Sequence, residues 1–492
     1  MRRKERPIKK PPIIHPFLLA LFPIAFLFAH NIEMIFISEI LLPSAVMLGF
    51  AALALLLLTP LLGDGGRAGI VVSLFWVLFF SYGHVAHLAE QRLGGDFRHG
   101  YLLFAWALLL VGGVCATLRI RDAGRWTLLL NVVALALLVP SLVKVGTYQL
   151  EARRIKQTAS PPPAEQAGAN PGEAGHEDLP DIYYIVPDRY ASATTLERHF
   201  DFDNSEFLDA LADRGFYVAD ESYANYPKTF LSLASSLNMK HLTSLTDELG
   251  REASNQTIVY EMLQDYEVWR FLKARGYTFM HFGTGWEPTR YNRYADKNFV
   301  VWPAEFSMML YQTTMLEPIG VELNILNERE MQRRAIEKKF DTLAQMPEKE
   351  GPKFVFAHLL LPHHPYVFDP EGERLPEEEV EGMTEAEKYL SQLAFANQKL
   401  SWLIDQILEK SERPPIIILQ SDEGPFIPFH LEYGGAGTDW RQLDDEAIRT
   451  HMRILNAYHL PGVDADEILY PSITPVNTFR VILDHYFGTD HG

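Results

Sequence analysis

The 492-residue chain contains a single cysteine, and its acidic residues outnumber its basic residues to give a net charge of −19. The cysteine, Cys115, lies within an apolar segment. No intramolecular disulfide can form, so a disulfide-stabilised scaffold is excluded. An acidic chain without a basic patch in its body argues against nucleic acid as a partner. The length predicts two or more domains.

The first third of the chain is dominated by apolar runs. They occupy residues 14–30, 41–62, 69–88, 101–118 and 126–144. Most of them approach the roughly 20 residues that are needed to cross a bilayer core. Five runs in succession cannot be one cleaved signal peptide, which has a single short apolar region. We therefore predict a five-helix transmembrane domain at 1–150.

The distribution of Lys and Arg predicts the orientation of this domain. The first ten residues carry six basic side chains, and the fourth connection contributes Arg119, Arg121 and Arg125. The first connection has no basic residue, and the third mixes both signs. Because basic loops stay on the cytoplasmic side, we expect a cytoplasmic N-terminus. After five crossings the C-terminal region would then be extracytoplasmic.

The composition and the hydrophobic pattern of the sequence change after the apolar runs. Residues 151–180 form a predicted linker rich in Pro, Ala, Gly and Glu, which is typical of a flexible tether. From 181 to 492, short apolar strands alternate with amphipathic helices, such as those near 204–214, 327–346 and 384–410. This alternation indicates an α/β domain. The predicted fold is a multi-pass α-helical membrane domain followed by an α/β domain with a mainly parallel sheet.

Two of the predicted strands end in acidic residues. The run IIILQSDEGP reaches Asp422 and Glu423, and the run DIYYIVPDRY reaches Asp188. Strands that are apolar on both faces belong at the centre of a parallel sheet, and ligands bind just past the carboxyl ends of such strands. Acids at that edge are costly unless something positive binds them. Oxygen ligands from two strand ends suit a divalent metal, so we predict a metal-dependent active site.

A threonine lies between these two acidic strand ends in the sequence. In NYPKTFLSLASSLNM, Thr229 follows an extended segment and precedes a run that fits a buried helix. A hydroxyl at this place can simply cap the helix. The alternative is a metal-activated nucleophile whose phosphoryl target is held by the free amides of the helix N-terminus.

Three histidines cluster at the end of another apolar strand. His358, His363 and His364 lie in AHLLLPHHPYVF. They are candidates for metal ligands, for general acids that protonate a leaving group, or for phosphate-binding groups. The other interpretation is that they only order a loop.

The order of these residues resembles the alkaline phosphatase superfamily. Asp188 follows a strand, Thr229 opens a helix, His358 and His363 are five residues apart, and Asp422 stands on a turn before a glycine. The similarity is strongest to the sulfatase-like branch, which contains lipoteichoic acid synthases and lipid A phosphoethanolamine transferases. Those proteins also place a five-helix membrane domain before an outward-facing catalytic domain. The intervals are similar too, with 41 residues from Asp188 to Thr229 and 193 from there to Asp422.

The resemblance implies roles for these residues. Asp188, Thr229 and Asp422 would bind the metal, and Thr229 would also be the nucleophile that forms a phosphoryl-threonine intermediate. His363, and less directly His358, would contact the phosphate or the leaving group. The resemblance further implies Mn or Zn, a phospholipid head-group donor, and an envelope lipid or glycan acceptor. The expected location is the inner membrane of a bacterium, with the catalytic domain in the periplasm.

The chain departs from the family pattern at the metal site. The family usually reads Asp-His-Gly where this chain has Asp422, Glu423 and Gly424. A carboxylate in place of an imidazole makes the ligand set all-oxygen, which fits Mg or Mn better than Zn. Asp188 stands where the transferases present Glu. Sulfatases of this superfamily use a formylglycine made from Cys or Ser in a Cys/Ser-x-Pro-x-Arg setting. No such residue stands around Thr229, so we do not expect sulfate ester hydrolysis by that chemistry.

Two functions from different classes follow. The first is a membrane-anchored, metal-dependent phosphotransferase or phosphodiesterase that acts on phospholipid head groups. The second is a catalytically inactive relative that binds an envelope lipid or glycan, and the exchange at Glu423 motivates it. Metal content separates the two, because only the first requires a stoichiometric divalent ion.

Overall fold

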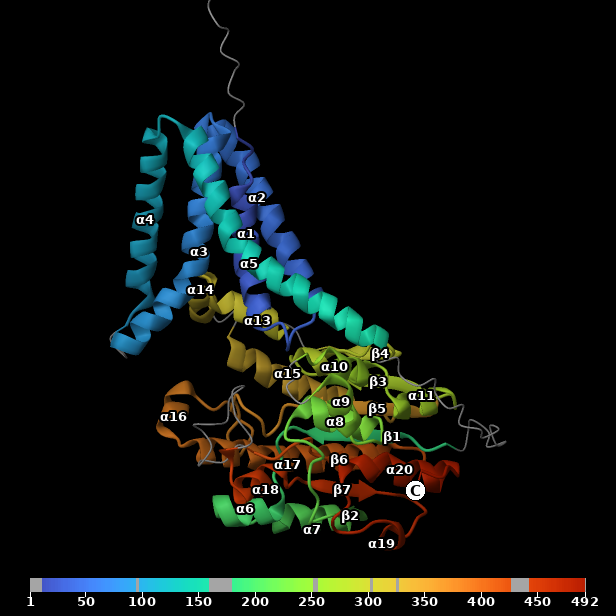
Figure 1. Ribbon diagram of the computed structural model, residues 1–492. Helices are drawn as coiled ribbons and strands as arrows, with labels where there is room; N and C mark the ends of the chain where they lie inside the picture. The colour runs from blue at the N-terminus through green and yellow to red at the C-terminus, as the bar shows by residue number, and fades with distance from the viewer. Residues whose placement is uncertain are drawn as a thin grey trace, which may run out of the picture. The chain divides into compact units, whose positions relative to one another are not determined.

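The structure is a computed structural model of the chain and describes residues 11–93, 97–158, 179–250, 255–300, 304–323, 327–425 and 442–491 (Figure 1). The chain divides into two compact units. The first contains Met1–Gln157 and Pro303–Asn327. The second contains Thr158–Trp302 and Glu328–Gly492.

The first unit is a group of apolar helices. They are α1 (His15–His30), α2 (Leu41–Leu62), α3 (Gly65–Leu93), α4 (His99–Arg119) and α5 (Ala123–Thr158), with a short 3-10 segment at Ile37–Ile40. Of the helices in the described residues, four are long and apolar enough to cross a membrane, namely Ile37–Leu62, Gly65–Leu93, His99–Arg119 and Ala123–Ile155. Helix α1 has 16 residues. That is about 24 Å at 1.5 Å per residue, shorter than a ~30 Å hydrocarbon core. A membrane crossing by α1 therefore stays a prediction.

A segment from the later sequence packs into this unit. It contains α13 (Glu305–Gln312) and α14 (Leu316–Glu322). Phe306 is fully buried in one cluster with Phe28 and Trp76. We predicted 181–492 as one domain, and the structure places Pro303–Asn327 with the helical unit instead. The reason is that the apolar side of α13 is buried there.

The end of the helical unit also differs from the predicted boundary. We placed the linker at 151–180, but α5 continues to Thr158 because helix-forming residues such as Leu150, Glu151 and Arg153 extend the last apolar turn. The rest of the predicted linker, 159–178, lies outside the described residues.

The second unit is built on a sheet that has seven strands in the described residues. They are β1 (Ile182–Pro187), β2 (Phe216–Val218), β3 (Thr278–Phe282), β4 (Lys297–Phe299), β5 (Lys353–Leu359), β6 (Ile416–Gln420) and β7 (Asn456–His459). Their order is β2-β7-β6-β1-β5-β3-β4. Strand β7 is antiparallel to both of its neighbours, and the other pairs are parallel. The prediction of a mainly parallel α/β sheet is confirmed.

The two strands that were predicted to be central, β1 and β6, lie side by side, and β5 pairs with the other edge of β1. Every residue of β1, β5 and β6 is buried. In the register of β1, Val186 pairs with His358 of β5 and Ile185 pairs with Leu419 of β6. The carboxyl ends of these strands therefore meet at one edge of the sheet, which is the place where ligands bind in such folds.

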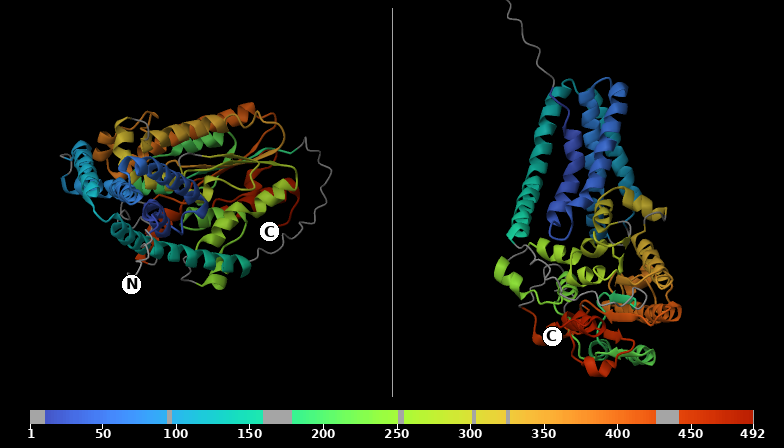
Figure 2. Two further views of the ribbon diagram at one scale, coloured as in Figure 1. Left: turned by 90° about the horizontal axis from the view of Figure 1, so that it is seen from above. Right: turned by 90° about the vertical axis from the view of Figure 1, so that its right-hand side faces the viewer.

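Helices cover both faces of the sheet (Figure 2). One group contains α7 (Ser205–Asp213), α15 (Glu328–Leu343) and α17 (Glu385–Lys410), which match the predicted helices. Tyr183 and Val355 share a buried cluster with side chains of these three helices. The other group contains α8 (Thr229–Leu237), α10 (Thr257–Gln264), α11 (Glu267–Lys273) and α20 (Pro475–Phe487). Tyr184 and Phe354 contact Phe479 of α20 on this face.

Shorter helices complete the unit. They are α6 (Ala193–Phe200), α9 (Thr243–Leu249), α12 (Glu287–Arg290), α16 (Glu377–Gly382), α18 (Asp445–Met452) and α19 (Ala465–Ile468). Two of them matter for the site, because α12 carries Thr289 and α18 carries His451.

Candidate metal centre

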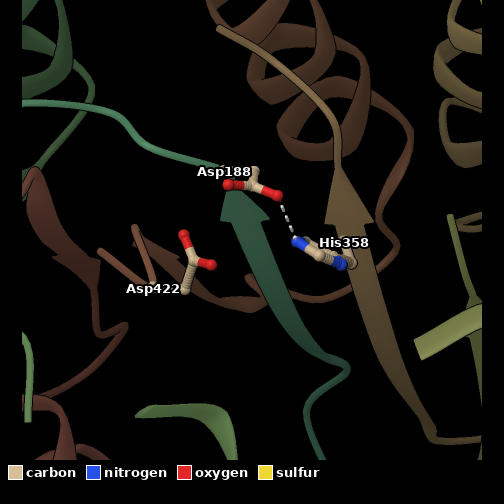
Figure 3. Close-up of side chains that lie close together, drawn as sticks. All are labelled: Asp188, His358 and Asp422. Carbon is tan, nitrogen blue, oxygen red and sulfur yellow. Dashed lines mark hydrogen bonds and ion pairs between the residues drawn. The ribbon is translucent and has the colours of Figure 1, made fainter. Parts of the chain in front are cut away.

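Three side chains from the central strands converge at the predicted edge of the sheet (Figure 3). Asp188 follows β1, His358 is the penultimate residue of β5, and Asp422 follows β6. Each offers one ligand atom, and these atoms lie within 4.8 Å of one another. The sequence predicted the meeting of the two acids, because adjacent parallel strands end at the same edge.

The cluster has the properties of a cation site. All three residues are buried, with 3% or less of their surface exposed. Within the described part of the chain, Asp188 Oδ1 and Asp422 Oδ2 have no hydrogen-bond partner. Ligand atoms that lie about 2.1 Å from one ion are at most about 4.2 Å apart, so binding has to draw the three together slightly. Two carboxylates and one imidazole suit Mn, Zn or Fe, and the residues therefore fit a divalent metal.

The electrostatics of the three-residue cluster also fit a bound cation. Burial raises the pKa of Asp188 to about 7, and the neighbouring Glu423 adds to the rise. Burial also raises the pKa of Asp422 to about 7, with further contributions from Asp188 and Glu423. Like charges at this separation resist joint ionisation. A cation between these carboxylates would remove that repulsion.

His358 is held with one ring nitrogen facing the acids. Its Nε2 lies 3.1 Å from Asp188 Oδ2, and its Nδ1 lies 2.9 Å from Thr289 Oγ1. The Thr289 hydroxyl in turn lies 3.1 Å from Thr284 Oγ1. Lys339 Nζ donates to the carbonyl oxygen of His358 at 2.8 Å, which fixes the strand end. Partners of this kind set the tautomer and the direction of a metal-binding imidazole.

Thr229 is the first residue of α8, as predicted. The N-cap residue is Lys228, and no side-chain cap hydrogen bond is made there. Capping by the Thr229 hydroxyl is therefore not its role in this structure. Burial raises the pKa of Asp422, and the side chain of Thr229 is close enough to oppose part of that rise by hydrogen bonding. The first amides of an α-helix have no partner within the helix, and such groups bind anions at helix N-termini.

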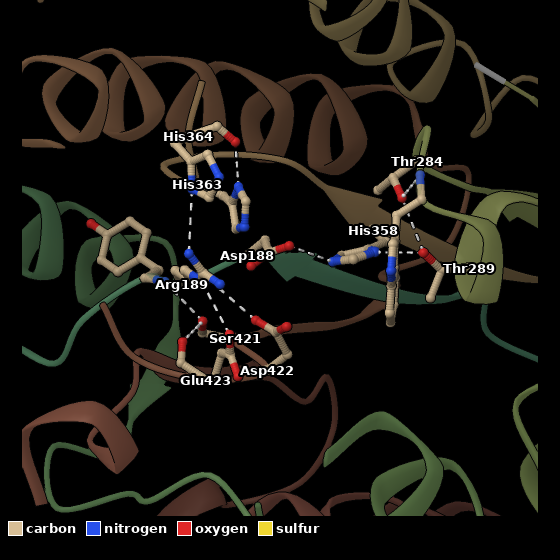
Figure 4. A network of polar contacts seen from close by, with 12 residues as sticks. Asp188, Arg189, Thr284, Thr289, His358, His363, His364, Ser421, Asp422 and Glu423 are labelled. Atoms are coloured by element: carbon tan, nitrogen blue, oxygen red, sulfur yellow. Dashed lines mark hydrogen bonds and ion pairs between the residues drawn. The ribbon is translucent and has the colours of Figure 1, made fainter. Parts of the chain in front are cut away.

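Glu423 is separate from the three-residue cluster (Figure 4). Its Oε1 accepts a hydrogen bond from Arg189 Nε at 3.1 Å, and its Oε2 lies 3.6 Å from His451 Nε2. The backbone N–H of Arg189 donates to Asp422 Oδ1 at 3.2 Å. We predicted Glu423 as a metal ligand, and this stays a prediction; in the structure its carboxylate is paired with the Arg189 guanidinium.

The other two predicted histidines lie on the Arg189 side of the site (Figure 4). Arg189 Nη1 is 3.4 Å from His364 Nδ1, and the rings of His363 and His364 stack with centroids 4.1 Å apart. Burial and the Arg189 charge lower the pKa of both imidazoles. Both rings are therefore mainly uncharged at neutral pH, and because a guanidinium can only donate, His364 Nδ1 accepts in its contact with Arg189.

The sequence interpretation missed four residues of the site, namely Arg189, Thr289, Lys339 and His451. Arg189 was visible as the neighbour of Asp188 in PDRY. Lys339 lies on an amphipathic helix and is only 8% exposed, but nothing in the local sequence marks it as buried. Thr289 and His451 come from short helices that no strand pattern connects with the sheet edge.

Comparison with solved structures finds similar folds at low identity. The integral membrane lipooligosaccharide phosphoethanolamine transferase A (EptA) from Neisseria meningitidis has 12% identity and a TM-score of 0.41, covering 95% of this chain and 94% of that chain. The periplasmic domain of EptC from Escherichia coli in complex with Zn has 13% identity and a TM-score of 0.41, covering 63% and 84%. The putative sulfatase yidJ from Bacteroides fragilis has 13% identity and a TM-score of 0.38, covering 65% and 75%.

The sequence matches no family model, and no curated protein matches it. The identities are near 13% and the TM-scores near 0.4, so these structures assign no activity to this chain.

Proposed function

We propose that the protein is a membrane-anchored, metal-dependent phosphotransferase or phosphodiesterase that acts on phospholipid-derived head groups through Thr229. The observation that carries the proposal is the meeting of Asp188, His358 and Asp422 beside the N-terminus of α8, where Thr229 is the first residue. A cation site next to a hydroxyl and to free helix amides is the arrangement that phosphoryl transfer needs.

The ligand set that we propose is Asp188, His358 and Asp422, which lie together in the structure, with Thr229 as a fourth position. A divalent cation held there supplies the positive charge that favours ionisation of a hydroxyl and stabilises phosphoryl oxygens. Thr289 keeps the His358 ring directed at the acids through its contact with Nδ1. The composition of the set allows Mn or Zn, and Mg less well, because one ligand is an imidazole nitrogen.

In the proposed reaction, Thr229 Oγ attacks the phosphorus of a phosphodiester. The bond from phosphorus to Oγ forms while the bond from phosphorus to the diacylglycerol oxygen breaks. The proton that Thr229 loses balances the proton that the leaving oxygen gains. An acceptor hydroxyl or water then attacks the same phosphorus and restores the Thr229 hydroxyl.

The remaining polar groups of the site suit the phosphate. The first amides of α8 attract its oxygens through the partial positive charge of the helix N-terminus. His363 and His364 lie beside Arg189, and because the pKa of both imidazoles is lowered, we propose that they contact the phosphate or the leaving group as neutral hydrogen-bonding groups.

The helical unit would anchor this site in its lipid environment. Four of its helices are long and apolar enough to cross a membrane. We propose the inner membrane of a bacterium, with a cytoplasmic N-terminus and the second unit outside. Donor and acceptor, an envelope lipid or glycan, would then be reached at the bilayer surface.

The test replaces Thr229 in the full-length protein. With Mn2+ and phosphatidylethanolamine or phosphatidylglycerol in mixed micelles, Thr229→Ala should reduce diacylglycerol release by at least about 1,000-fold, because it removes the nucleophile. Mass spectrometry of the wild-type protein should find the head-group phosphate as an adduct on Thr229.

Thr257→Ala is the matched control, since Thr257 is also a half-buried first residue of a helix in the same unit. It should leave turnover within about twofold. Undiminished turnover in Thr229→Ala contradicts the proposal. A wild-type protein that binds no divalent ion and turns over no lipid supports the inactive lipid- or glycan-binding relative instead.

A further inference from the structure

A cavity lies between α6 and α18, two helices of the second unit that are side by side (Figure 1). Its volume is about 40 Å³. One ordered water needs roughly 10–15 Å³ of such space, so the cavity has room for a group the size of a phosphate and not for a large ligand. None of the three residues of the metal cluster lines it, so the cavity is separate from that site.

The two helices are joined near both ends of α6. Before its first turn, the Ser192 N–H donates to the carbonyl oxygen of Arg453 at 3.3 Å. In its last turn, His199 Nε2 lies 3.2 Å from Thr450 Oγ1 and 3.5 Å from Glu446 Oε1. These contacts fix the spacing of α6 and α18, so the cavity is formed before any ligand enters it.

The lining of the cavity is strongly basic. Arg198, Arg449 and Arg453 bring three guanidinium groups to it, and Glu446 brings the one carboxylate. The lining therefore has two positive charges in excess, although the net charge of the chain is −19. Within the described part of the chain, none of the three guanidinium groups forms an ion pair. Like charges that face one cavity repel one another, and an anion between them removes that cost.

Arg453 is already held in position. Its Nε donates to the Tyr223 hydroxyl at 2.9 Å, and its guanidinium lies 5.5 Å from the centroid of the Tyr223 ring. The side chain is half-buried. A guanidinium bound through Nε still presents its two terminal nitrogens, which donate in directions that match the oxygens of a phosphate.

From these observations we propose that the cavity between α6 and α18 binds one phosphate group through Arg198, Arg449 and Arg453. A phosphate dianion matches the excess of two positive charges, and its tetrahedral oxygens can meet guanidinium groups from two helices at once. The group is either free phosphate or the head group of a lipid such as phosphatidic acid. Neither the metal cluster nor Thr229 takes part, so the inference does not rest on the proposed function.

The experiment titrates inorganic phosphate into the full-length protein in detergent, at about pH 8, where phosphate is mainly a dianion. The metal is first removed with a chelator, so that no cation attracts phosphate to the metal centre. Calorimetry should find one phosphate per wild-type chain. Arg198→Met and Arg449→Met should each weaken binding by at least about tenfold, because each removes charge-assisted hydrogen bonds. Both side chains are exposed, so these variants should fold.

Two further variants localise the site. Tyr223→Phe should weaken binding by about threefold, because it removes the hydroxyl that positions Arg453. Thr229→Ala should bind phosphate as wild type does, because Thr229 does not line the cavity. Hydrogen exchange of the backbone amides in α6 and α18 should slow when phosphate is added to wild type.

Arg374→Met is the matched control, because Arg374 is an exposed arginine of the same unit that does not line the cavity. It should leave phosphate affinity within about twofold. Dihexanoyl phosphatidic acid distinguishes the two sources of the phosphate group. Tighter binding than that of inorganic phosphate assigns the cavity to a lipid head group, and equal or weaker binding assigns it to free phosphate.

The outcomes are separate from those for the proposed function. A wild-type chain that binds no phosphate overturns the inference, as do Arg198→Met and Arg449→Met variants that bind it like wild type. Equal losses in Arg449→Met and Arg374→Met overturn it too, because they show a general effect of charge. A loss of binding in Thr229→Ala, with none in Arg449→Met, places the anion at the metal centre and likewise overturns the inference. Each of these results leaves the proposed function standing.

Discussion

Asp188 and Asp422 are buried carboxyl groups. Burial keeps them protonated to a higher pH than an exposed aspartic acid. The pKa of each rises from 3.8 to about 7. Between these values the folded protein without a cation holds protons that the unfolded chain has lost. Stability of the metal-free protein therefore falls as pH rises from about 4 to 7. The two acids form a coupled pair, so the protons belong to the pair.

The first prediction concerns metal affinity against pH. Because a divalent ion must displace these protons, Mn2+ affinity should rise by about tenfold per pH unit for each proton released, and should level off above about pH 7. Calorimetry in two buffers of different ionisation enthalpy, at about pH 6, 7 and 8, measures both the affinity and the protons released. An affinity that does not change between pH 6 and 7 contradicts the site as described.

At the scale of elements, the turn after β6 packs closely against the backbone at the end of α18. Gly424 stands between Glu423 and the backbone of this helix. An added Cβ would lie 2.5 Å from the His451 carbonyl oxygen and 3.0 Å from that of Arg453. Both atoms belong to the backbone, so neither can move away by a change of rotamer. The sequence showed a glycine after two acids, and the structure supplies the reason for it.

The second prediction follows from this approach. Gly424→Ala should reduce the free energy of unfolding by about 1–3 kcal/mol, because the methyl group forces the turn and α18 apart. The same shift moves Asp422, so Mn2+ affinity should fall by about tenfold or more. Thermal unfolding and calorimetry measure the two effects.

The control for this variant is Gly382→Ala. Gly382 has nothing within 4 Å of the place where its Cβ would be. The substitution should change the free energy of unfolding by less than about 0.5 kcal/mol. Equal behaviour of the two alanine variants would show that the close approach at Gly424 has no energetic consequence.

At the scale of the whole molecule, one segment of the later sequence belongs to the helical unit and not to the sheet unit that surrounds it in the sequence. Residues 303–327 belong to the helical unit, although the sequence before and after them belongs to the sheet unit. The anchoring side chain is Phe306, which is fully buried with Phe28 and Trp76. Met315 N also donates to the Phe79 carbonyl oxygen at 3.1 Å.

The third prediction tests this grouping. Phe306→Ala should destabilise the helical unit by about 3–5 kcal/mol, because it leaves a cavity among packed side chains. It should lower the thermal unfolding midpoint of the full-length protein in detergent. Mn2+ affinity should stay within about twofold, because the metal ligands lie in the other unit.

Phe104→Ala serves as the comparison, since Phe104 is 65% exposed in the same unit. It should shift the unfolding midpoint much less. A loss of Mn2+ affinity in Phe306→Ala, with an unchanged midpoint, would contradict the assignment of this segment to the helical unit.

The sequence by itself determined the local features of this protein. Apolar runs predicted the helices of the first unit, and apolar strands that end in Asp188 and Asp422 predicted the centre of a parallel sheet and the meeting of two acids. The position of Thr229 at the start of a helix was also readable. These features follow from periodicity and from the rule that parallel strands share a carboxyl edge, so residues near each other in sequence carry the information.

Only the tertiary structure decided how the site is completed. His358 joins the acids because Thr289, 69 residues earlier, holds its ring. Glu423 is paired with Arg189, 234 residues earlier, and its second oxygen lies 3.6 Å from His451 Nε2. Contacts of this kind depend on side-chain direction and on the packing of distant helices, which no local pattern records. For that reason the sequence predicted the place of a cation site, and the tertiary structure determined which side chains lie there.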